Sequence, residues 1–209
     1  MAVTEPISKV NLERITNGIY AFTMTLMIRN IQTPPPGTIE NSASFFAYIS
    51  TTLLAVVDFI GAFLILGMFW LFYFQIFHRM KTFDFRFLYI HFLSLMIVVF
   101  VPFTQSFTSN STGFAVADIL FQLNYFALSV VLIYGWYYAT RTNPSLLVPE
   151  LTRPEIAFLT KKFLVPVGVA SLGIVTLVLG LPFYDSLYLL PFVILLAFFR
   201  HPPAVPGNA

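Results

Sequence analysis

Long runs of apolar residues recur along the chain and are separated by short polar or proline-containing segments. The runs are continuous rather than alternating, and most approach or exceed the roughly 20 residues that a transmembrane helix needs. They predict an all-α membrane protein with six transmembrane helices in a single domain, residues 1–200, followed by a disordered tail, residues 201–209. The predicted helices cover residues 11–33, 44–77, 87–107, 114–140, 163–181 and 186–199.

The first run differs from the other five. Only fourteen uncharged residues separate Arg14 from Arg29, which is about 21 Å of helix at ~1.5 Å per residue and well short of a hydrocarbon core of about 30 Å. The run also contains Thr and Asn side chains, whose polar atoms need hydrogen-bond partners inside a membrane. We therefore expect this first helix to be central, within a bundle, rather than in contact with lipid.

A helical wheel divides this helix into two sets of residues. At about 100° per residue, one stripe contains Asn11, Ile15, Gly18, Phe22, Thr25, Leu26 and Arg29. Thr16, Asn17 and Thr23 point elsewhere, toward positions where neighbouring helices can lie. The stripe is either the lining of a shared water-filled axis or an ordinary packing face. Arg29 favours the axis, because a sealed apolar core seldom contains a guanidinium.

Composition and charge narrow the class of protein. The chain is 58% hydrophobic and 10% charged with a mean hydropathy of +0.83, whereas soluble proteins are roughly 25% charged. The net charge of +2 gives no reason to expect nucleic acid as a partner, and the absence of cysteine excludes thiolate chemistry. The N-terminal residues lack the pattern of a signal peptide, so the first helix is expected to remain in the protein.

The basic residues predict the orientation. Ten of the eleven Lys and Arg residues fall on one side of the predicted helices, and Arg29 is the exception. Because cytoplasmic loops carry an excess of Lys and Arg, both termini are predicted to be cytoplasmic.

Asp58 lies in the middle of the second run, where a carboxylate is costly in a bilayer. One interpretation is a proton or cation relay. The other is an Asp that is hydrogen-bonded inside the bundle, which we favour because no second intramembrane acid or base accompanies it.

The fourth run contains Asp118, Gln122 and Asn124. Asp118 and Gln122 are i,i+4 neighbours, and Asn124 points away from them. We expect these side chains to form hydrogen bonds between helices rather than a ligand set.

The histidines, His78, His91 and His201, have no metal-ligand spacing on one helix and are expected at the membrane interface. The sequence also lacks a nucleophile paired with a base, a glycine-rich phosphate loop and a carboxylate pair. We therefore predict no enzymatic activity, no metal site and no cofactor other than permeant monovalent ions.

Three segments of the chain resemble a known family, the prokaryotic relatives of the endosomal and lysosomal potassium channel called transmembrane protein 175. In the first helix, that family has Arg, three residues and then Phe-Ser-Asp, and the same spacing here falls on Asn11, Ile15, Thr16 and Asn17. The segments FIGAFLILGMFWLFYFQIF, residues 59–77, and HFLSLMIVVFVPFTQSF, residues 91–107, are similar to the second and third helices.

This resemblance implies a homotetramer of six-helix subunits in the lipid bilayer, with four copies of the first helix lining a pore that conducts potassium or other monovalent cations. By position, it implies a hydrophobic gate at Phe22, a selectivity layer at Thr25, and further pore residues at Leu26 and Arg29. It also implies that Asn11, Ile15, Thr16 and Asn17 attach the first helix to its neighbours. The family's prokaryotic members suggest the plasma membrane as its location.

Two other functions stay open at this point. One is a proton-coupled transporter that uses Asp58. The other is a non-conducting or anion-permeable homologue, because four Arg29 residues near the outer mouth would repel potassium and attract anions. The carboxylates of Glu40 and Asp185, expected on the same side, are candidates to neutralise Arg29.

Overall fold

The computed structural model describes residues 8–110, 115–181, 187 and 190–199. Within these residues the chain forms α-helices joined by short turns, with no strand. The helices are α1 (Lys9–Leu26), α2 (Ser42–His78), α3 (Phe85–Asn110), α4 (Ala115–Tyr137), α5 (Arg153–Val178) and α6 (Leu190–Phe198). Short 3₁₀ or π turns occupy Met27–Asn30, Tyr138–Thr142 and Pro144–Leu146. The predicted tail, residues 201–209, lies outside the described residues.

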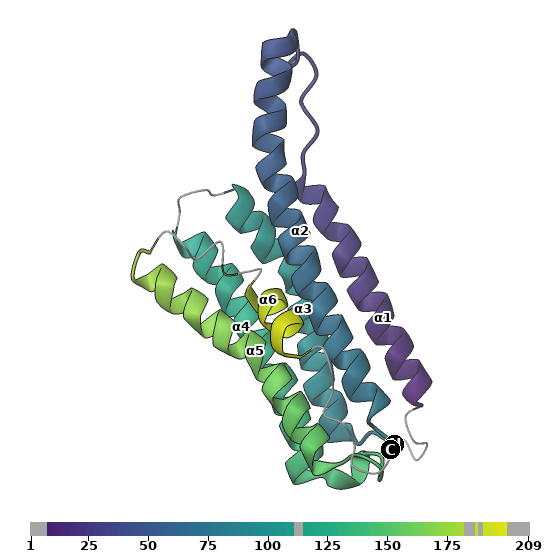
Figure 1. Cartoon of the computed structure of the whole chain (residues 1–209). Coiled ribbons are helices and arrows are strands. Elements are labelled where there is room, and N and C mark those ends of the chain that lie inside the picture. The colour runs from purple at the N-terminus through teal and green to yellow at the C-terminus, as the bar shows by residue number, and fades with distance from the viewer. Residues whose placement is uncertain (1–7, 111–114, 182–186, 188–189, 200–209) are drawn as a thin grey trace.

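The helices lie side by side in a bundle (Figure 1). α3 packs on α4, α4 packs on α5, and α1 packs mainly on α2 and α3. α1 therefore lies at the edge of the bundle of its own chain, because it buries only one stripe of side chains and neighbours cover it on one side only. Its expected central position in an assembly of subunits stays a prediction.

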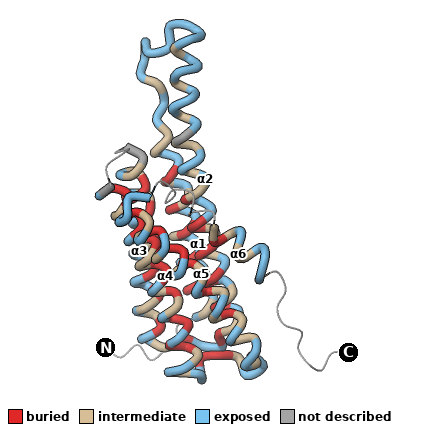
Figure 2. Tube along the Cα trace, turned by 60° about the vertical axis from the view of Figure 1, so that its left-hand side comes forward, coloured by how far each residue is buried: buried red, intermediate tan, exposed pale blue. Residues whose placement is uncertain are grey.

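α2 is longer than a membrane requires, as the length of the second apolar run predicts. Its 37 residues correspond to about 55 Å of helix, against a hydrocarbon core of about 30 Å. The N-terminal part of α2 projects beyond the other helices together with the segment that precedes it, and most of this projection is exposed (Figures 1 and 2). A capping box between Asn41 and Ser44 starts the helix, and the Tyr48 hydroxyl donates to the Gln32 carbonyl at 2.6 Å.

α1 ends earlier than the sequence predicts. The α-helix stops at Leu26 and a 3₁₀ turn continues to Asn30, rather than a helix continuing to residue 33. Side-chain hydrogen bonds explain the position of this turn, since Asn30 donates to the Pro102 carbonyl at 3.4 Å and also to the Gln105 side chain. A tightened last turn is a common way to satisfy the final carbonyls of a helix.

α5 begins ten residues before its predicted start at residue 163. The prolines and charges before that position resemble a linker, but they form the first turns of a helix. Thr152 caps the helix by accepting from the Glu155 amide at 3.4 Å, and Pro154 occupies the first turn, where its missing N–H costs nothing.

Five helix ends meet at one end of the bundle, where most of the basic residues also lie. The turn after α2 pairs with the turn after α4, because the Lys81 amide donates to the Leu146 carbonyl at 2.7 Å. Arg79 forms an ion pair with Glu155 at 3.0 Å, which joins the end of α2 to the start of α5. Lys9, at the start of α1, donates to the Met80 carbonyl at 3.1 Å.

Four of the described helical segments are long and apolar enough to cross a membrane: Ser42–His78, Phe85–Thr108, Val116–Thr142 and Arg153–Val178. α1 and the described part of α6, with 18 and nine residues, do not qualify on these criteria. The fold is therefore all-helical with at least four strongly apolar candidate spans.

Candidate functional site

α1 has two faces with opposite surroundings. Its buried face carries Leu12, Thr16, Tyr20 and Thr23, and Met27 continues this stripe into the 3₁₀ turn. Its exposed face carries Asn11, Ile15, Gly18, Phe22, Thr25 and Arg29, with Leu26 at intermediate exposure. These exposed positions are the residues that the helical wheel places in one stripe. No other part of the described chain covers that stripe.

Phe22 lies near the middle of the exposed face and is 62% exposed. One turn further on, the Thr25 hydroxyl donates to the Phe22 carbonyl at 2.8 Å. A hydroxyl has one proton to donate, so this bond leaves the lone pairs of the Thr25 oxygen directed outward as acceptors.

Arg29 is exposed and lies in the 3₁₀ turn after α1, where the wheel's 100° per residue no longer applies. Within the described residues it forms no ion pair, and Glu40 does not reach it. Asp185 falls outside the described part of the chain. The positive charge near this end of the exposed face therefore has no neutralising carboxylate among the described residues.

Thr16 attaches the buried face of α1 to α3. Its hydroxyl donates to the Leu12 carbonyl at 2.8 Å and lies 2.7 Å from His91 Nε2. With its single proton given to Leu12, the Thr16 oxygen accepts from the Nε2–H of the neutral ring.

The structure corrects the expectation of an interfacial His91. The ring is 1% exposed and packs against Tyr73, Phe77 and Phe87, with centroid distances of 4.7, 5.1 and 6.4 Å. A sequence signal was available, since His91 is spaced four residues from Phe87 and from Leu95, both of which are buried apolar residues of α3.

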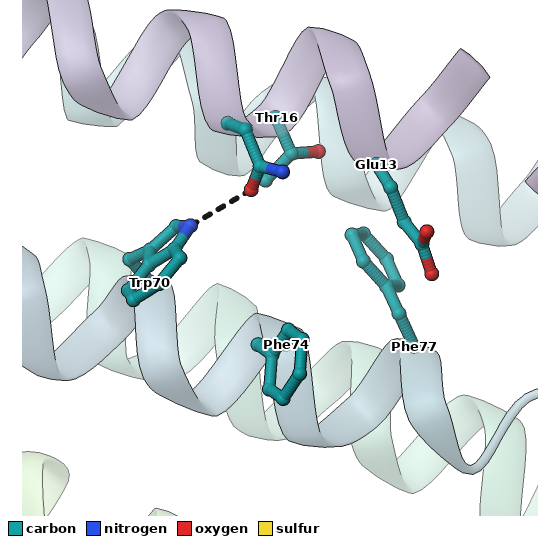
Figure 3. Close-up of a pocket in the computed structure, with 6 residues that line it drawn as sticks. Glu13, Thr16, Trp70, Phe74 and Phe77 are labelled. Atoms are coloured by element: carbon teal, nitrogen blue, oxygen red, sulfur yellow. Dashed lines mark hydrogen bonds between the residues drawn. The ribbon is translucent and has the colours of Figure 1, made fainter. Parts of the chain in front are cut away.

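Asn17 attaches α1 to α2. Its side-chain oxygen accepts from the Trp70 indole N–H at 2.8 Å. Beside this bond lies a pocket between the two helices, lined by Glu13, Thr16 and Asn17 from α1 and by three aromatic rings from α2 (Figure 3). Asn11 and Ile15, which the resemblance places in the same network as Thr16 and Asn17, are exposed in the single chain.

Asp58 lies on the exposed part of α2, not within the bundle of its own chain. The bundle of this one chain therefore does not enclose the carboxylate, and a hydrogen-bonded Asp58 within an assembly of subunits stays a prediction.

The polar residues of α4 lie inside the bundle. Asp118 and Gln122 are 5% and 1% exposed, and the Asn124 amide lies 3.1 Å from the Thr104 hydroxyl of α3. A Cβ added to Gly173 of α5 would lie 2.7 Å from Gln122 Oε1, so the Gln122 amide would have to shift to admit a larger residue there. The Asn124 contact joins two helices, as expected of these residues.

Asp84, before α3, links two turns at the basic end of the bundle. Its carboxylate accepts from the Phe87 amide at 2.8 Å, the Tyr138 hydroxyl at 2.5 Å and the Asn143 amide at 3.0 Å. Burial opposes ionisation, but these hydrogen bonds and the charge of Arg86 outweigh it and hold the pKa of Asp84 below its usual range.

Metal chemistry has no candidate within the described residues. No three His, Cys, Asp or Glu side chains in this part of the chain come close enough to hold a metal ion. His78 is exposed at the end of α2, and His201 lies outside the described residues.

The chain is similar to known channel proteins in sequence and in fold. Residues 11–102 match the family described as the endosomal/lysosomal potassium channel TMEM175. A curated potassium channel of Streptomyces collinus is 23% identical over 179 residues, which cover 84% of this chain and 82% of that protein.

Among solved structures, the chain resembles the crystal structure of a lysosomal potassium-selective channel TMEM175 homolog from Chamaesiphon minutus. The TM-score is 0.77 at 18% sequence identity, and the alignment covers 90% of this chain and 97% of that one. The family match in sequence covers most of α1, all of α2 and most of α3, whereas the similarity in fold extends over 90% of the chain. Together, these findings support the assignment of the chain to the TMEM175 family, a family of multi-pass membrane ion channels and not of enzymes.

Proposed function

We propose that this chain is the subunit of a homotetrameric potassium channel in a prokaryotic plasma membrane, with α1 lining the pore. The observation that carries the proposal is the exposed face of α1. A membrane helix that packs tightly on one side leaves the other side for lipid, for water or for another subunit. Arg29 on or near this face, together with the Thr25 oxygen, favours water over lipid, because a lipid-facing guanidinium would be costly.

Phe22 is the proposed gate. Four copies of a bulky apolar side chain around an axis exclude water from a narrow pore, and ions cannot pass where water is excluded. Thr25, one turn away, offers an outward-directed oxygen that suits a cation. We propose this residue as the selectivity layer and Leu26 as a further pore-lining residue.

Arg29 determines how selective the proposed channel can be. Four uncompensated guanidinium groups near one mouth create a positive potential that opposes cation entry. We therefore propose conduction of potassium with poor discrimination among monovalent cations. Arg29→Leu is expected to raise the ratio of potassium to chloride flux, and chloride preference in the wild type would overturn the cation assignment.

The gate is tested by ion flux into vesicles that contain the purified protein. Phe22→Ala is expected to increase potassium flux and Phe22→Trp to decrease it. Phe103→Ala is the matched control, because Phe103 is 60% exposed but lies on α3. Equal flux from all three variants and the wild type, in protein with the same melting temperature, would count against the gate.

Single cysteines provide a second test, because the chain has no cysteine of its own. Thr25→Cys, treated with a water-soluble thiol reagent, is expected to lose flux. Val175→Cys is the control, since Val175 is 52% exposed on α5, away from α1. Flux that is insensitive to the reagent in both variants, although mass spectrometry shows modification of the Thr25→Cys variant, would refute a pore lined by α1.

A further inference from the structure

A pocket between α1 and α2 combines aromatic rings with a carboxylate. Trp70, Phe74 and Phe77 project from α2 at i, i+4 and i+7, and Glu13, Thr16 and Asn17 project from α1 at i, i+3 and i+4 (Figure 3). Both spacings place the side chains on one helix face, so the two sets oppose each other. The cavity between them has a volume of about 60 Å³ and opens to one side.

The carboxylate of Glu13 has no partner within the described chain. No hydrogen bond or ion pair joins it to another described residue, although the pocket that it borders is largely aromatic. Lys9 lies one turn before it on the same helix, but its ammonium donates to the Met80 carbonyl. Arg14 adjoins Glu13 in sequence and is exposed, and it does not pair with it either.

Most of the remaining polar atoms of the pocket already form hydrogen bonds within the chain. The Thr16 hydroxyl is bonded to Leu12 and His91, and the Asn17 oxygen accepts from Trp70. Phe77 is 3% exposed and forms the closed wall, whereas Phe74 is 59% exposed and forms the open one. The free chemistry that the pocket offers is therefore negative charge beside aromatic faces.

We propose that this pocket binds an alkylammonium cation, with the ammonium against Glu13 and its carbon substituents against Trp70 and Phe74. Aromatic faces attract cations through the ring quadrupole, and a quaternary or alkylated ammonium is hydrated weakly enough to exchange water for such faces. The carboxylate adds direct charge attraction. A hydrated potassium ion lacks the apolar groups that would fill the aromatic part of the pocket.

The same chemistry has two sources, a free amine and the headgroup of a phospholipid such as phosphatidylcholine. Glu13 is close to the basic end of the bundle, where helix ends and turns meet. Arg14, directly beside it, is available to the phosphate of such a headgroup. Neither source depends on ion conduction, so the binding site and the proposed channel function can fail separately.

Tryptophan fluorescence gives a direct readout, because the chain has only two tryptophans. Trp70 lines the pocket, whereas Trp136 is 0% exposed and donates to Thr160 at 2.8 Å. In a non-ionic detergent, tetramethylammonium chloride is expected to change the emission saturably, and potassium chloride at equal ionic strength is not. The change should disappear in Trp70→Phe.

The decisive variant is Glu13→Gln, which removes the charge and keeps the size of the side chain. It is expected to weaken tetramethylammonium binding by roughly tenfold or more, measured by the same titration and by equilibrium dialysis of the radiolabelled cation. Glu40→Gln, an exposed carboxylate outside the pocket, is the matched control and should bind as the wild type does. No saturable response in the wild type, or an equal response in Glu13→Gln, would overturn the proposal.

Nanodiscs of two lipid compositions distinguish a lipid headgroup from a free amine as the ligand of the pocket. If the site takes a lipid headgroup, tetramethylammonium will change the emission in phosphatidylglycerol discs but not in phosphatidylcholine discs, where the site is already filled. If it takes a free amine, both lipids will give the same titration. Either result supports an alkylammonium site, and a response to tetramethylammonium in neither lipid refutes it.

Discussion

Replacing Thr16 by valine tests how α1 is held on α3. The hydroxyl of Thr16 lies 2.7 Å from His91 Nε2, and the two residues are 2% and 1% exposed. Valine keeps nearly the same shape but offers no polar atom, so the ring nitrogen loses its partner where water does not replace it. Hydrogen bonds between membrane helices contribute about 0.6 kcal/mol on average and up to about 1.7 kcal/mol, and a buried polar atom left unpaired costs about 1–3 kcal/mol. We expect Thr16→Val to lower the free energy of unfolding by about 1–2 kcal/mol.

The assay is thermal unfolding in one detergent, where this loss corresponds to a fall in Tm of about 2–8 °C for a chain of this size. Thr16→Ser keeps the hydroxyl and should lose much less. In a His91→Phe background, which retains a ring beside Tyr73 and Phe77, Thr16→Val should cost under about 0.5 kcal/mol, because no ring nitrogen remains to be stranded. An equal cost of Thr16→Val in both backgrounds would refute the hydrogen bond as the attachment of α1.

Three further predictions follow from buried groups and from the turn before α3. Tyr20→Phe should raise the melting temperature slightly, because the buried Tyr20 hydroxyl has no hydrogen-bond partner among the described residues; a clear loss of stability would contradict this. The pKa of the Asp84 carboxyl is held below its usual value of 3.8, so the contribution of the carboxylate to folding stability is complete above that pH and is lost as the pH falls through the lowered pKa. The difference in melting temperature between wild type and Asp84→Asn should therefore shrink on acidification below about pH 4. Gly173→Val should lower the free energy of unfolding by about 1–3 kcal/mol, because the added side chain clashes with Gln122. Gly168→Val, with nothing within 4 Å of an added Cβ, should have the smaller effect in the same thermal assay.

The positions of the long helices could be predicted from the sequence because their apolar runs leave few alternatives in a membrane. The helical wheel of residues 11–33 also predicts which side chains of the first helix are covered by the rest of the chain. Phe22 and Thr25 are exposed and Thr16 is buried, and a period of 3.6 residues is sufficient to separate them. The assignment of Phe22 and Thr25 to a pore stays a prediction, since it depends on other subunits.

The exact bounds of α1 and α5 and the burial of His91 depend on tertiary contacts, which local sequence patterns do not reveal. The composition of Pro154 and its charged neighbours predicts a linker, but α5 begins there because proline is well suited to a first helical turn. The early end of α1 depends on Asn30 reaching α3. A histidine near a basic loop is typical of a membrane interface, whereas the buried position of His91 depends on a threonine 75 positions away in the sequence.

The contacts at the two ends of α1 limit how its exposed face can move. At one end of α1, Lys9 forms a hydrogen bond with the turn after α2, and at the other end Asn30 forms hydrogen bonds with α3. Because both ends of α1 are attached, we expect the exposed face to change by rotation of its own side chains or by movement of α1 together with α2 and α3. Exposed side chains change rotamer in picoseconds to nanoseconds, whereas collective helix movements take microseconds to milliseconds. The lifetime of a single opening would therefore distinguish a gate formed by Phe22 rotamers from one formed by whole-subunit motion.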